Sequence, residues 1–184
     1  LFTGGFTTGD NQRPEQTKTA QPQNLPPQPP TAPTIIADLD LGTEELQLGA
    51  YLGDKNAPVK ILSCEDYQCP FCRKFWEETL PQIKQTYLDT GKAVYIYGDF
   101  PLPFHTEADE MHEAANCAGE QDKYWDMHDK IFQTQQQWAG QPNPQEKARE
   151  LAQEIGLNMD KYDQCIKKGN QKTEIQNDIT ECTK

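Results

Sequence analysis

The sequence predicts an α/β fold in which a strand, a helix and a second strand are followed by a long run of helices. Two short runs rich in β-branched and aromatic residues, 59–64 and 93–98, are typical of strands. Between them, apolar residues recur at helical spacing from Phe71 to Leu88. This strand–helix–strand order favours parallel pairing of the two strands through a right-handed crossover.

The N-terminal segment differs in composition from the rest of the chain. Residues 1–34 contain almost no core-forming residues, and residues 10–34 are rich in Gln, Thr and Pro, with six prolines between Pro22 and Pro33. Such a segment cannot offset its ordering entropy by burying apolar surface, and its prolines favour an extended spacer. We expect a disordered linker over 1–34, which either holds a domain at a distance or has no role, and one domain over 35–184.

The first strand follows a transitional stretch, 35–52, and a turn at 54–58. A helix then begins near Cys69-Pro70, because proline suits the first turn of a helix, where its missing N–H leaves no bond unmade. Pro81 interrupts the helical hydrogen bonds and should kink this helix, and Gly91 should end it. Beyond the second strand we expect helices at 106–119, 122–136, 144–155 and 159–168, with another from about 171.

The chain is acidic, with a formal net charge of −12. An acidic folded part repels phosphate backbones and anionic headgroups, which argues against nucleic acid or a membrane surface as the main partner. No apolar run approaches the length of a bilayer span. The opening residues from Leu1 are either the trailing edge of an upstream signal or membrane anchor, or an arbitrary chain boundary.

The functional prediction depends on the motif Cys69-Pro70-Phe71-Cys72. Two cysteines three positions apart on the first turn of a helix can close a small disulfide. The N–H groups and the dipole at a helix N-terminus favour the thiolate of the first cysteine. Exchange then proceeds through a mixed disulfide that the second cysteine resolves. Cys69 is therefore the expected attacking thiol and Cys72 the resolving thiol, with Pro70 and Phe71 as the supporting loop.

Half of a zinc site has the same spacing as this cysteine pair. Zinc would need a second pair of ligands close in sequence. Cys117, Cys165 and Cys182 are isolated, and the three histidines form no ligand-spaced pair with them. We therefore favour a redox role, expect no metal and no cofactor beyond the two cysteines, and keep a metal site or a purely structural role as the weaker alternative.

Five separated stretches of the chain form a recognisable set: 52–59 (LGDKNAPV), 66–72 (DYQCPFC), 99–105 (DFPLPFH), 114–118 (AANCA) and 124–128 (YWDMH). Through these stretches and their order, the chain from Leu52 to Lys184 resembles DsbA-like proteins of the BdbD type. The resemblance implies a thioredoxin-like fold with a helical insert at about 104–168. It also implies an extracytoplasmic enzyme that forms or exchanges disulfides in client proteins and is recycled by a membrane redox partner.

The sequence departs from this family pattern at two places. The family's buried acid, a proton relay six residues before the first active cysteine, is replaced by Ser63. Glu65 shares strand parity with Ser63 and either substitutes for that acid or is merely exposed. The chain also stops at Lys184, where the family continues with a cis-proline loop, two strands and a helix. We therefore expect an incomplete domain that is unstable or aggregated on its own, because a sheet edge and an apolar face are uncovered.

The resemblance bears on the remaining cysteines as well, because some relatives carry a structural disulfide at places similar to Cys117 and Cys165. We therefore expect a Cys117–Cys165 bridge, with two separately buried thiols as the alternative. Cys64 is first interpreted as a small core residue, with a Cys64–Cys182 bridge as the less favoured alternative. His105 either lies near the active site or, as we favour, caps or hydrogen-bonds its loop. The other histidines and the tryptophans are interpreted as ordinary helix and packing residues.

Three functions remain open at this point. The leading one is an enzyme that oxidises or reshuffles the disulfides of client proteins through its own dithiol. Its first rival is a reductant-side protein that keeps one specific partner reduced. The second rival is a non-catalytic binding domain of the same fold. The redox potential of the Cys69–Cys72 pair separates the first two, and the effect of replacing Cys69 tests the third.

Overall fold

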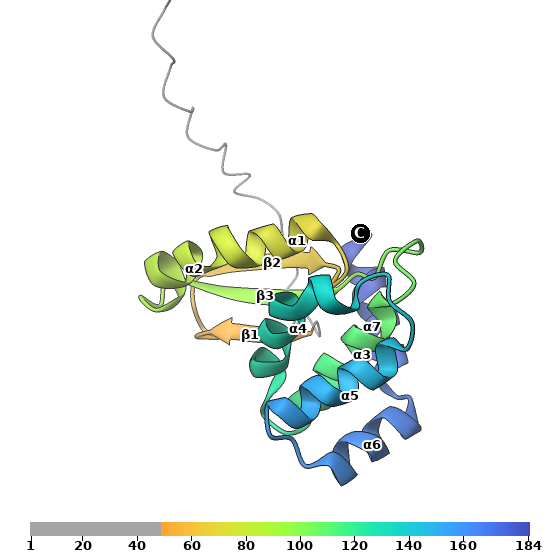
Figure 1. Ribbon diagram of the computed structural model, residues 1–184. Helices are drawn as coiled ribbons and strands as arrows, with labels where there is room; N and C mark the ends of the chain where they lie inside the picture. Colours follow the sequence, from red (N-terminus) through yellow and green to blue (C-terminus); the bar gives the residue numbers. More distant parts are fainter. Residues whose placement is uncertain (1–48) are drawn as a thin grey trace, which may run out of the picture. The chain divides into compact units, whose positions relative to one another are not determined.

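The computed structural model describes residues 49–184, so the linker predicted for 1–34 and most of the transitional stretch lie outside the described residues. Three strands form one mixed sheet in the order β1–β3–β2 (Figure 1). They are β1 (Ala50–Gly53), β2 (Val59–Glu65) and β3 (Ala93–Asp99). As predicted, β2 pairs with β3 in parallel. Within residues 49–184, β2 has a strand partner on one side only.

Strand β1 was not predicted. It has four residues and pairs antiparallel with β3, from Ala50 opposite Tyr97 to Gly53 opposite Val94. Gly49 precedes it at φ +20°, and a Cβ atom at that position would lie 1.9 Å from the carbonyl oxygen of Tyr97. Only glycine allows so close an approach of the two backbones. The strand therefore depends on a distant partner and one glycine rather than on a local apolar pattern.

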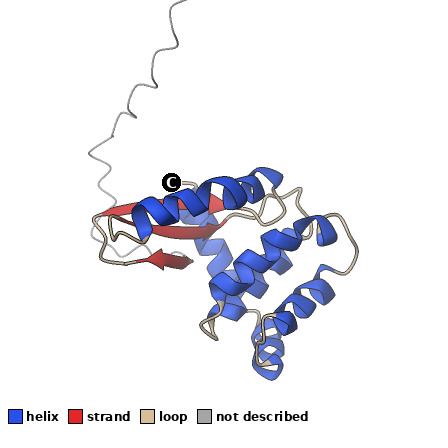
Figure 2. Cartoon of the chain, turned by 60° about the vertical axis from the view of Figure 1, so that its left-hand side comes forward, coloured by secondary structure: helices blue, strands red, loops and turns tan. Residues whose placement is uncertain are grey.

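The helical segment between β2 and β3 is continuous from Pro70 to Leu88. It consists of α1 (Pro70–Lys74), a π-helical turn η1 (Phe75–Thr79), α2 (Leu80–Ile83) and a second π-helical turn η2 (Lys84–Leu88). Pro81 lies in the first turn of α2, and the N–H of Leu80 donates to the carbonyl of Phe75, five residues back. The interruption expected at the proline thus takes the form of wider turns around it. Figure 2 shows this segment lying along one face of the sheet.

Strand β3 is the centre of the core, and each of its residues is buried. On one face, Tyr95 stacks on Phe75 at 6.3 Å between ring centroids, and Tyr97 stacks on Tyr67 at 5.3 Å. Burying one large side chain of this kind stabilises a fold by about 1.5–3 kcal/mol. Because Tyr67 belongs to the turn that precedes Cys69, this core also anchors the cysteine motif.

Helices follow β3 to the end of the chain, within two residues of the predicted bounds. They are α3 (Ala108–Gly119), α4 (Tyr124–Trp138), α5 (Pro144–Glu154), α6 (Met159–Lys168) and α7 (Gln171–Cys182). Helix α3 is the most deeply buried, and its small residues Ala114, Ala115 and Ala118 belong to the hydrophobic core together with residues of α4 and α5. Small side chains let helix backbones approach closely, which suits a helix surrounded by others.

Two disulfides join these elements. Cys117 and Cys165 connect α3 to α6 with Cα atoms 5.8 Å apart (the α3–α6 disulfide). Cys64 and Cys182 connect β2 to α7 with Cα atoms 6.0 Å apart (the β2–α7 disulfide). The first interpretation of Cys64 as a small core residue is therefore wrong. Gly98 makes room for the second bridge, since a Cβ there would lie 3.0 Å from the sulfur of Cys182.

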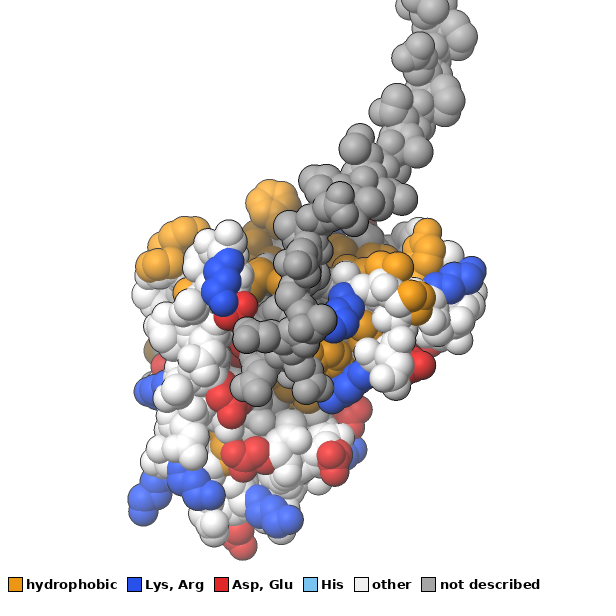
Figure 3. Space-filling view, turned by 180° about the vertical axis from the view of Figure 1, so that it is seen from behind, with side chains coloured by type: hydrophobic (Ala, Val, Ile, Leu, Met, Phe, Trp, Pro, Cys, Tyr) orange, Lys and Arg blue, Asp and Glu red, His pale blue; other side chains and the backbone are white. Residues whose placement is uncertain are grey.

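One face of the molecule is mixed in charge. On the face shown in Figure 3, Lys and Arg side chains are interspersed with Asp and Glu, so neither sign dominates the visible part of that face. Within residues 49–184, every helix is too short or too polar to span a bilayer.

Candidate active site

The two cysteines of the motif lie where β2 leads into α1. Cys69 is the N-cap residue, with an extended backbone (φ −70°, ψ 122°), and no side-chain hydrogen bond caps the helix there. Pro70 is in the first turn and has no N–H. The remaining N–H groups of that turn carry partial positive charge and suit an anionic sulfur. Both Cys69 and Cys72 are unbridged and half-buried.

Cys72 holds its proton more firmly than an ordinary thiol. Burial raises the pKa of Cys72 from 9.0 to about 12, opposed by a hydrogen bond from the backbone of Asp66 and reinforced by the charges of Cys69 and Glu65. At neutral pH, Cys72 is therefore a neutral thiol. It can attack a disulfide only if a neighbouring group takes its proton.

Glu65, the last residue of β2, lies near enough for its charge to raise the pKa of Cys72. It is 4% exposed, and its Oε1 accepts hydrogen bonds from the hydroxyl of Ser63 (2.6 Å) and from that of Tyr95. Its Oε2 is buried and has no hydrogen-bond partner among residues 49–184. Burial and then the charge of Glu65 raise the pKa of Tyr95 far above its ordinary range. The alternative that Glu65 is merely exposed is therefore wrong.

Asp66 ties the turn that carries Cys69 to a second loop. It is 2% exposed, and its side chain accepts hydrogen bonds from the N–H groups of Gln68 and Leu102, each at 2.7 Å. The same carboxylate lies 2.7 Å from Nδ1 of His105. Its main-chain oxygen accepts the N–H of Cys69 at 3.1 Å. The side chain of His105 thus contacts the active-site turn, while its main-chain N–H donates to the carbonyl of Leu102 in its own loop at 2.8 Å. Both the expected hydrogen bond to its loop and the alternative place near the active-site turn are confirmed.

Two glutamines hold the same turn from the helical side. The amide of Gln68 donates to Glu107 Oε2 at 2.5 Å and accepts the N–H of Glu107 at 3.1 Å. Gln135, on α4, donates from Nε2 to the carbonyls of Tyr67 (2.7 Å) and Cys69 (3.0 Å). The helices after β3 therefore position the turn directly.

Sequence reasoning missed Gln135, although a signal was present. It lies four residues after Ile131 and three before Trp138, and both of these are buried. That spacing places a glutamine on the buried face of α4. The neighbouring exposed glutamines at 133, 136 and 137 obscure this pattern, because together they make the stretch appear uniformly polar.

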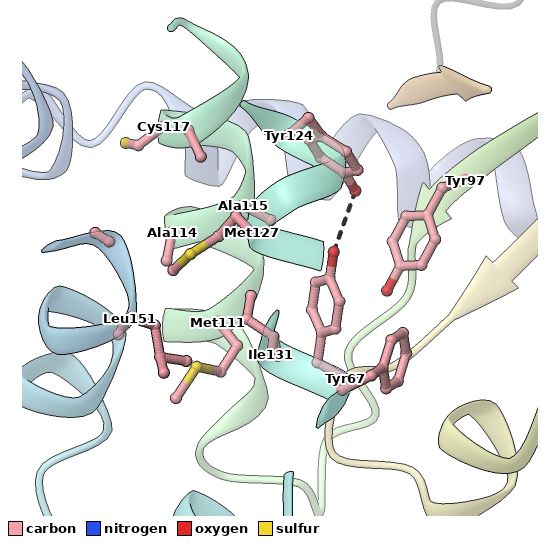
Figure 4. Close-up of a cluster of buried hydrophobic side chains, with 14 of the residues drawn as sticks. Tyr67, Tyr97, Met111, Ala114, Ala115, Cys117, Tyr124, Met127, Ile131 and Leu151 are labelled. Atoms are coloured by element: carbon pink, nitrogen blue, oxygen red, sulfur yellow. Dashed lines mark hydrogen bonds between the residues drawn. The ribbon is translucent and has the colours of Figure 1, made fainter. Parts of the chain in front are cut away.

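An aromatic cluster includes Tyr67 of the turn together with Tyr97 and Tyr124, whose side chains lie close together in the core (Figure 4). Tyr67 is fully buried, and its hydroxyl donates to that of Tyr124 at 3.5 Å, with Tyr97 beside them. Burial raises the pKa of all three tyrosines, so they remain neutral. The ring centroids of His112 and Tyr67 lie 4.6 Å apart, and Nδ1 of His112 lies 2.5 Å from Oδ1 of Asp99. This cluster fixes the side chain of Tyr67, two residues before Cys69.

The surface near the cysteines carries two exposed aromatic rings. Phe71, between the cysteines, is 79% exposed, and Phe104, on the loop that Asp66 ties to the turn, is 72% exposed. Large apolar side chains left in water commonly mark a contact surface. In residues 49–184, no group of three or more His, Cys, Asp or Glu is arranged to hold a metal ion. The site combines two free thiols with two exposed aromatic rings.

Known proteins resemble this chain in sequence and fold. A family model described as thioredoxin matches residues 46–184. Disulfide bond formation protein D of Bacillus subtilis is 29% identical over 94 residues, which cover 47% of this chain and 41% of that protein. The crystal structure of alpha-DsbA1 from Wolbachia pipientis has a TM-score of 0.62 and 27% identity, covering 71% of this chain and 65% of that one.

A structure of oxidised BdbD from Bacillus subtilis, at 23% identity and a TM-score of 0.59, agrees in fold. Matches to the curated relatives span 39–54% of those proteins' lengths. The predicted thioredoxin-like α/β fold and the DsbA-like resemblance are confirmed by these similarities.

Proposed function

Because the chain belongs to the thioredoxin family and resembles its DsbA-like members, we propose that it is a thiol–disulfide oxidoreductase acting on client proteins through Cys69 and Cys72. One observation carries the proposal, which is the different placement of the two cysteines on α1. Cys69 is the N-cap residue, where no side chain accepts from the first-turn N–H groups, and burial one turn later raises the pKa of the Cys72 thiol. The first position favours a thiolate and the second a thiol. This asymmetry assigns attack to Cys69 and resolution to Cys72.

Oxidation of a client proceeds in two exchanges. A client thiolate attacks the Cys69 sulfur of the Cys69–Cys72 disulfide, which forms a client–Cys69 disulfide and releases Cys72, which takes up a proton. A second client thiolate then attacks the client sulfur of that mixed disulfide and releases Cys69 as a thiolate. Two electrons pass from the client to the dithiol, and the client gains one disulfide.

Glu65 is the proton carrier for Cys72 in this proposal. Its unpartnered Oε2 takes the proton when Cys72 attacks a mixed disulfide and returns it when Cys72 leaves. The charge of Glu65 acts on the pKa of Cys72, which supports their proximity. The acid that the family places at the position of Ser63 is then supplied two residues later, on the same strand face.

The compartment and the recycling partner belong to the same proposal. The α3–α6 and β2–α7 disulfides support an extracytoplasmic location, since such bridges persist in oxidising compartments. A membrane redox partner would remove the two electrons left on the dithiol after each client. We also assign the oxidoreductase domain to residues 35–184, with a helical insert at about 104–168 that supplies Glu107 and Gln135 to the turn.

Clients would meet the enzyme as unfolded segments. The exposed rings of Phe71 and Phe104 offer apolar surface near Cys69, which suits segments that have not yet buried their own apolar residues. Nucleic acid is disfavoured as a partner by the net charge of −12.

Trapping tests the proposal. With an unfolded client that carries a disulfide, reduced Cys72→Ser should accumulate a mixed disulfide, because Cys69 attacks the client disulfide, one client sulfur leaves as a thiolate and no Cys72 resolves the product. Reduced Cys69→Ser should accumulate none. Equilibration of the wild-type pair with glutathione distinguishes an oxidising protein from the reductant-side rival. Full exchange activity in Cys69→Ser would show that the site is elsewhere and would leave only the non-catalytic interpretation of this motif.

A further inference from the structure

Helix α4 reaches into the active-site turn with one side chain. Gln135 is 5% exposed, and its Nε2 donates to the carbonyl oxygens of Tyr67 (2.7 Å) and Cys69 (3.0 Å). Carbonyl oxygens only accept hydrogen bonds, so both contacts require the amide NH₂ and fix its orientation. The two carbonyls belong to the residue that caps α1 and to the residue two positions before it.

The peptide groups of Cys69 are held from three directions. The N–H of Cys69 donates to the carbonyl of Asp66 at 3.1 Å, and its carbonyl accepts the N–H of Arg73 at 3.1 Å as well as Gln135. The orientation of Cys69 relative to α1 sets how closely its sulfur approaches the N–H groups of the first turn. Those N–H groups have no side-chain cap competing for them.

Packing alone does not explain a glutamine at this position. The rest of the buried face of α4 is largely apolar or aromatic, including Ile131, Phe132 and Trp138. Burying an amide costs free energy unless its hydrogen bonds are made, and a methionine or leucine would fill similar space without that cost. The two bonds made by Gln135 are directed to the active-site turn, so their effect falls on the geometry of Cys69.

We propose that Gln135 is a positioning residue that holds Cys69 where the first-turn N–H groups of α1 stabilise its thiolate. The proposal rests on the proposed exchange function and assigns a further residue to it. Gln135 touches neither the sulfur nor the client. It acts through the main chain of Tyr67 and Cys69.

The test compares Gln135→Met with Gln136→Met in the full chain. Methionine is similar in length but has no N–H to donate, and Gln136 is an exposed neighbour on the same helix. Thiolate absorbance of the reduced proteins is followed against pH, and each dithiol is equilibrated with glutathione. For Gln135→Met we expect the first thiolate transition to move to higher pH by about 0.5–1 unit. This shift is the size expected when the turn that supports the thiolate loses about one hydrogen bond.

The equilibrium should move in step with the titration. A thiolate that is less well stabilised makes the reduced form less favourable, so the fraction reduced at a fixed glutathione ratio should fall. A three- to tenfold change in the equilibrium constant corresponds to about 15–30 mV. If both quantities match those of Gln136→Met, Gln135 does not position Cys69 and the proposal is overturned.

A second variant keeps the proposal testable if Gln135→Met does not fold. The carboxylate of Gln135→Glu has no proton to donate to the two carbonyls, whereas the protonated acid can donate one. Its exchange rate, divided by that of the wild-type chain at the same pH, should therefore rise as the pH falls toward 4. A ratio that does not change with pH overturns the proposal. Failure of the proposed function is a separate result, namely unchanged exchange in Cys69→Ser.

Discussion

Replacing Glu65 with glutamine should slow one half of the exchange reaction and spare the other. Glutamine keeps the size of the side chain and can still accept from Ser63 and Tyr95, but it cannot carry a proton for Cys72. Attack by Cys69 does not need that proton transfer. Resolution by Cys72 does.

The size of the effect follows from the pKa of Cys72. The rise from 9.0 to about 12 corresponds to about 4 kcal/mol against the thiolate. Because Cys72 is only half-buried, solvent screening reduces this to about 2 kcal/mol, or about 30-fold in rate. Losing the charge of Glu65 offsets part of the loss, since that charge contributes to the raised pKa. We therefore expect a slowing of about 10- to 30-fold.

Stopped-flow reaction with an aromatic disulfide reagent separates the two steps. Each molecule of reduced protein releases one coloured thiolate when Cys69 attacks and a second when Cys72 resolves the mixed disulfide. Glu65→Gln should leave the first phase unchanged and slow the second, whereas Glu78→Gln, an exposed residue on η1, should alter neither. A second phase slowed less than threefold, or two phases slowed equally, would refute a proton-carrying role for Glu65.

Three further outcomes are expected. Alkylation of the reduced chain at mildly acidic pH should modify Cys69 well before Cys72, and preferential labelling of Cys72 would reverse their roles. Replacing the cysteines of the α3–α6 disulfide, which spans 48 residues, should cost about 4 kcal/mol of unfolding free energy, and doing so for the β2–α7 disulfide, which spans 118, about 5 kcal/mol. Urea titration measures both, and a cost below about 1 kcal/mol for either would contradict the chain-entropy argument. Burial raises the pKa of Asp178 from 3.8 to about 7, so the wild-type chain should lose stability relative to Asp178→Asn as the pH rises from about 4 to about 7; a constant difference over that range would contradict it.

The parts of the fold that sequence reasoning predicted are those set by local pattern. Strands β2 and β3 are short apolar runs, and the later helices follow 3.6-residue spacing, so their bounds emerge from neighbouring residues alone. The Cys69–Cys72 pair is likewise local, because the proline after Cys69 marks the helix start. These features need no knowledge of what packs against them.

The parts that were missed depend on partners distant in sequence. Strand β1 is too short to show a period and exists through its pairing with β3. The parity of Glu65 indicated the face of the strand on which it lies. It did not indicate that the hydroxyl of Tyr95, thirty residues later, would donate a hydrogen bond to Glu65 there. Gln135 contacts Cys69 and Tyr67, which precede it by 66 and 68 positions, and Cys64 is bridged to Cys182 across 118 residues. Contacts over such separations are fixed by the assembled core, not by local spacing.

The two structural disulfides form nested covalent rings. The inner ring closes between Cys117 and Cys165, and the outer ring closes between Cys64 and Cys182, so both active cysteines lie on the outer ring. A single peptide-bond cut anywhere between these outer cysteines leaves the two pieces joined by a sulfur–sulfur bond. Nicked protein would therefore keep its full mass until a reductant is added, and only then would the piece that carries Cys69 separate. In a protease-rich environment, that connectivity preserves the active site through cleavages that would divide an unbridged chain.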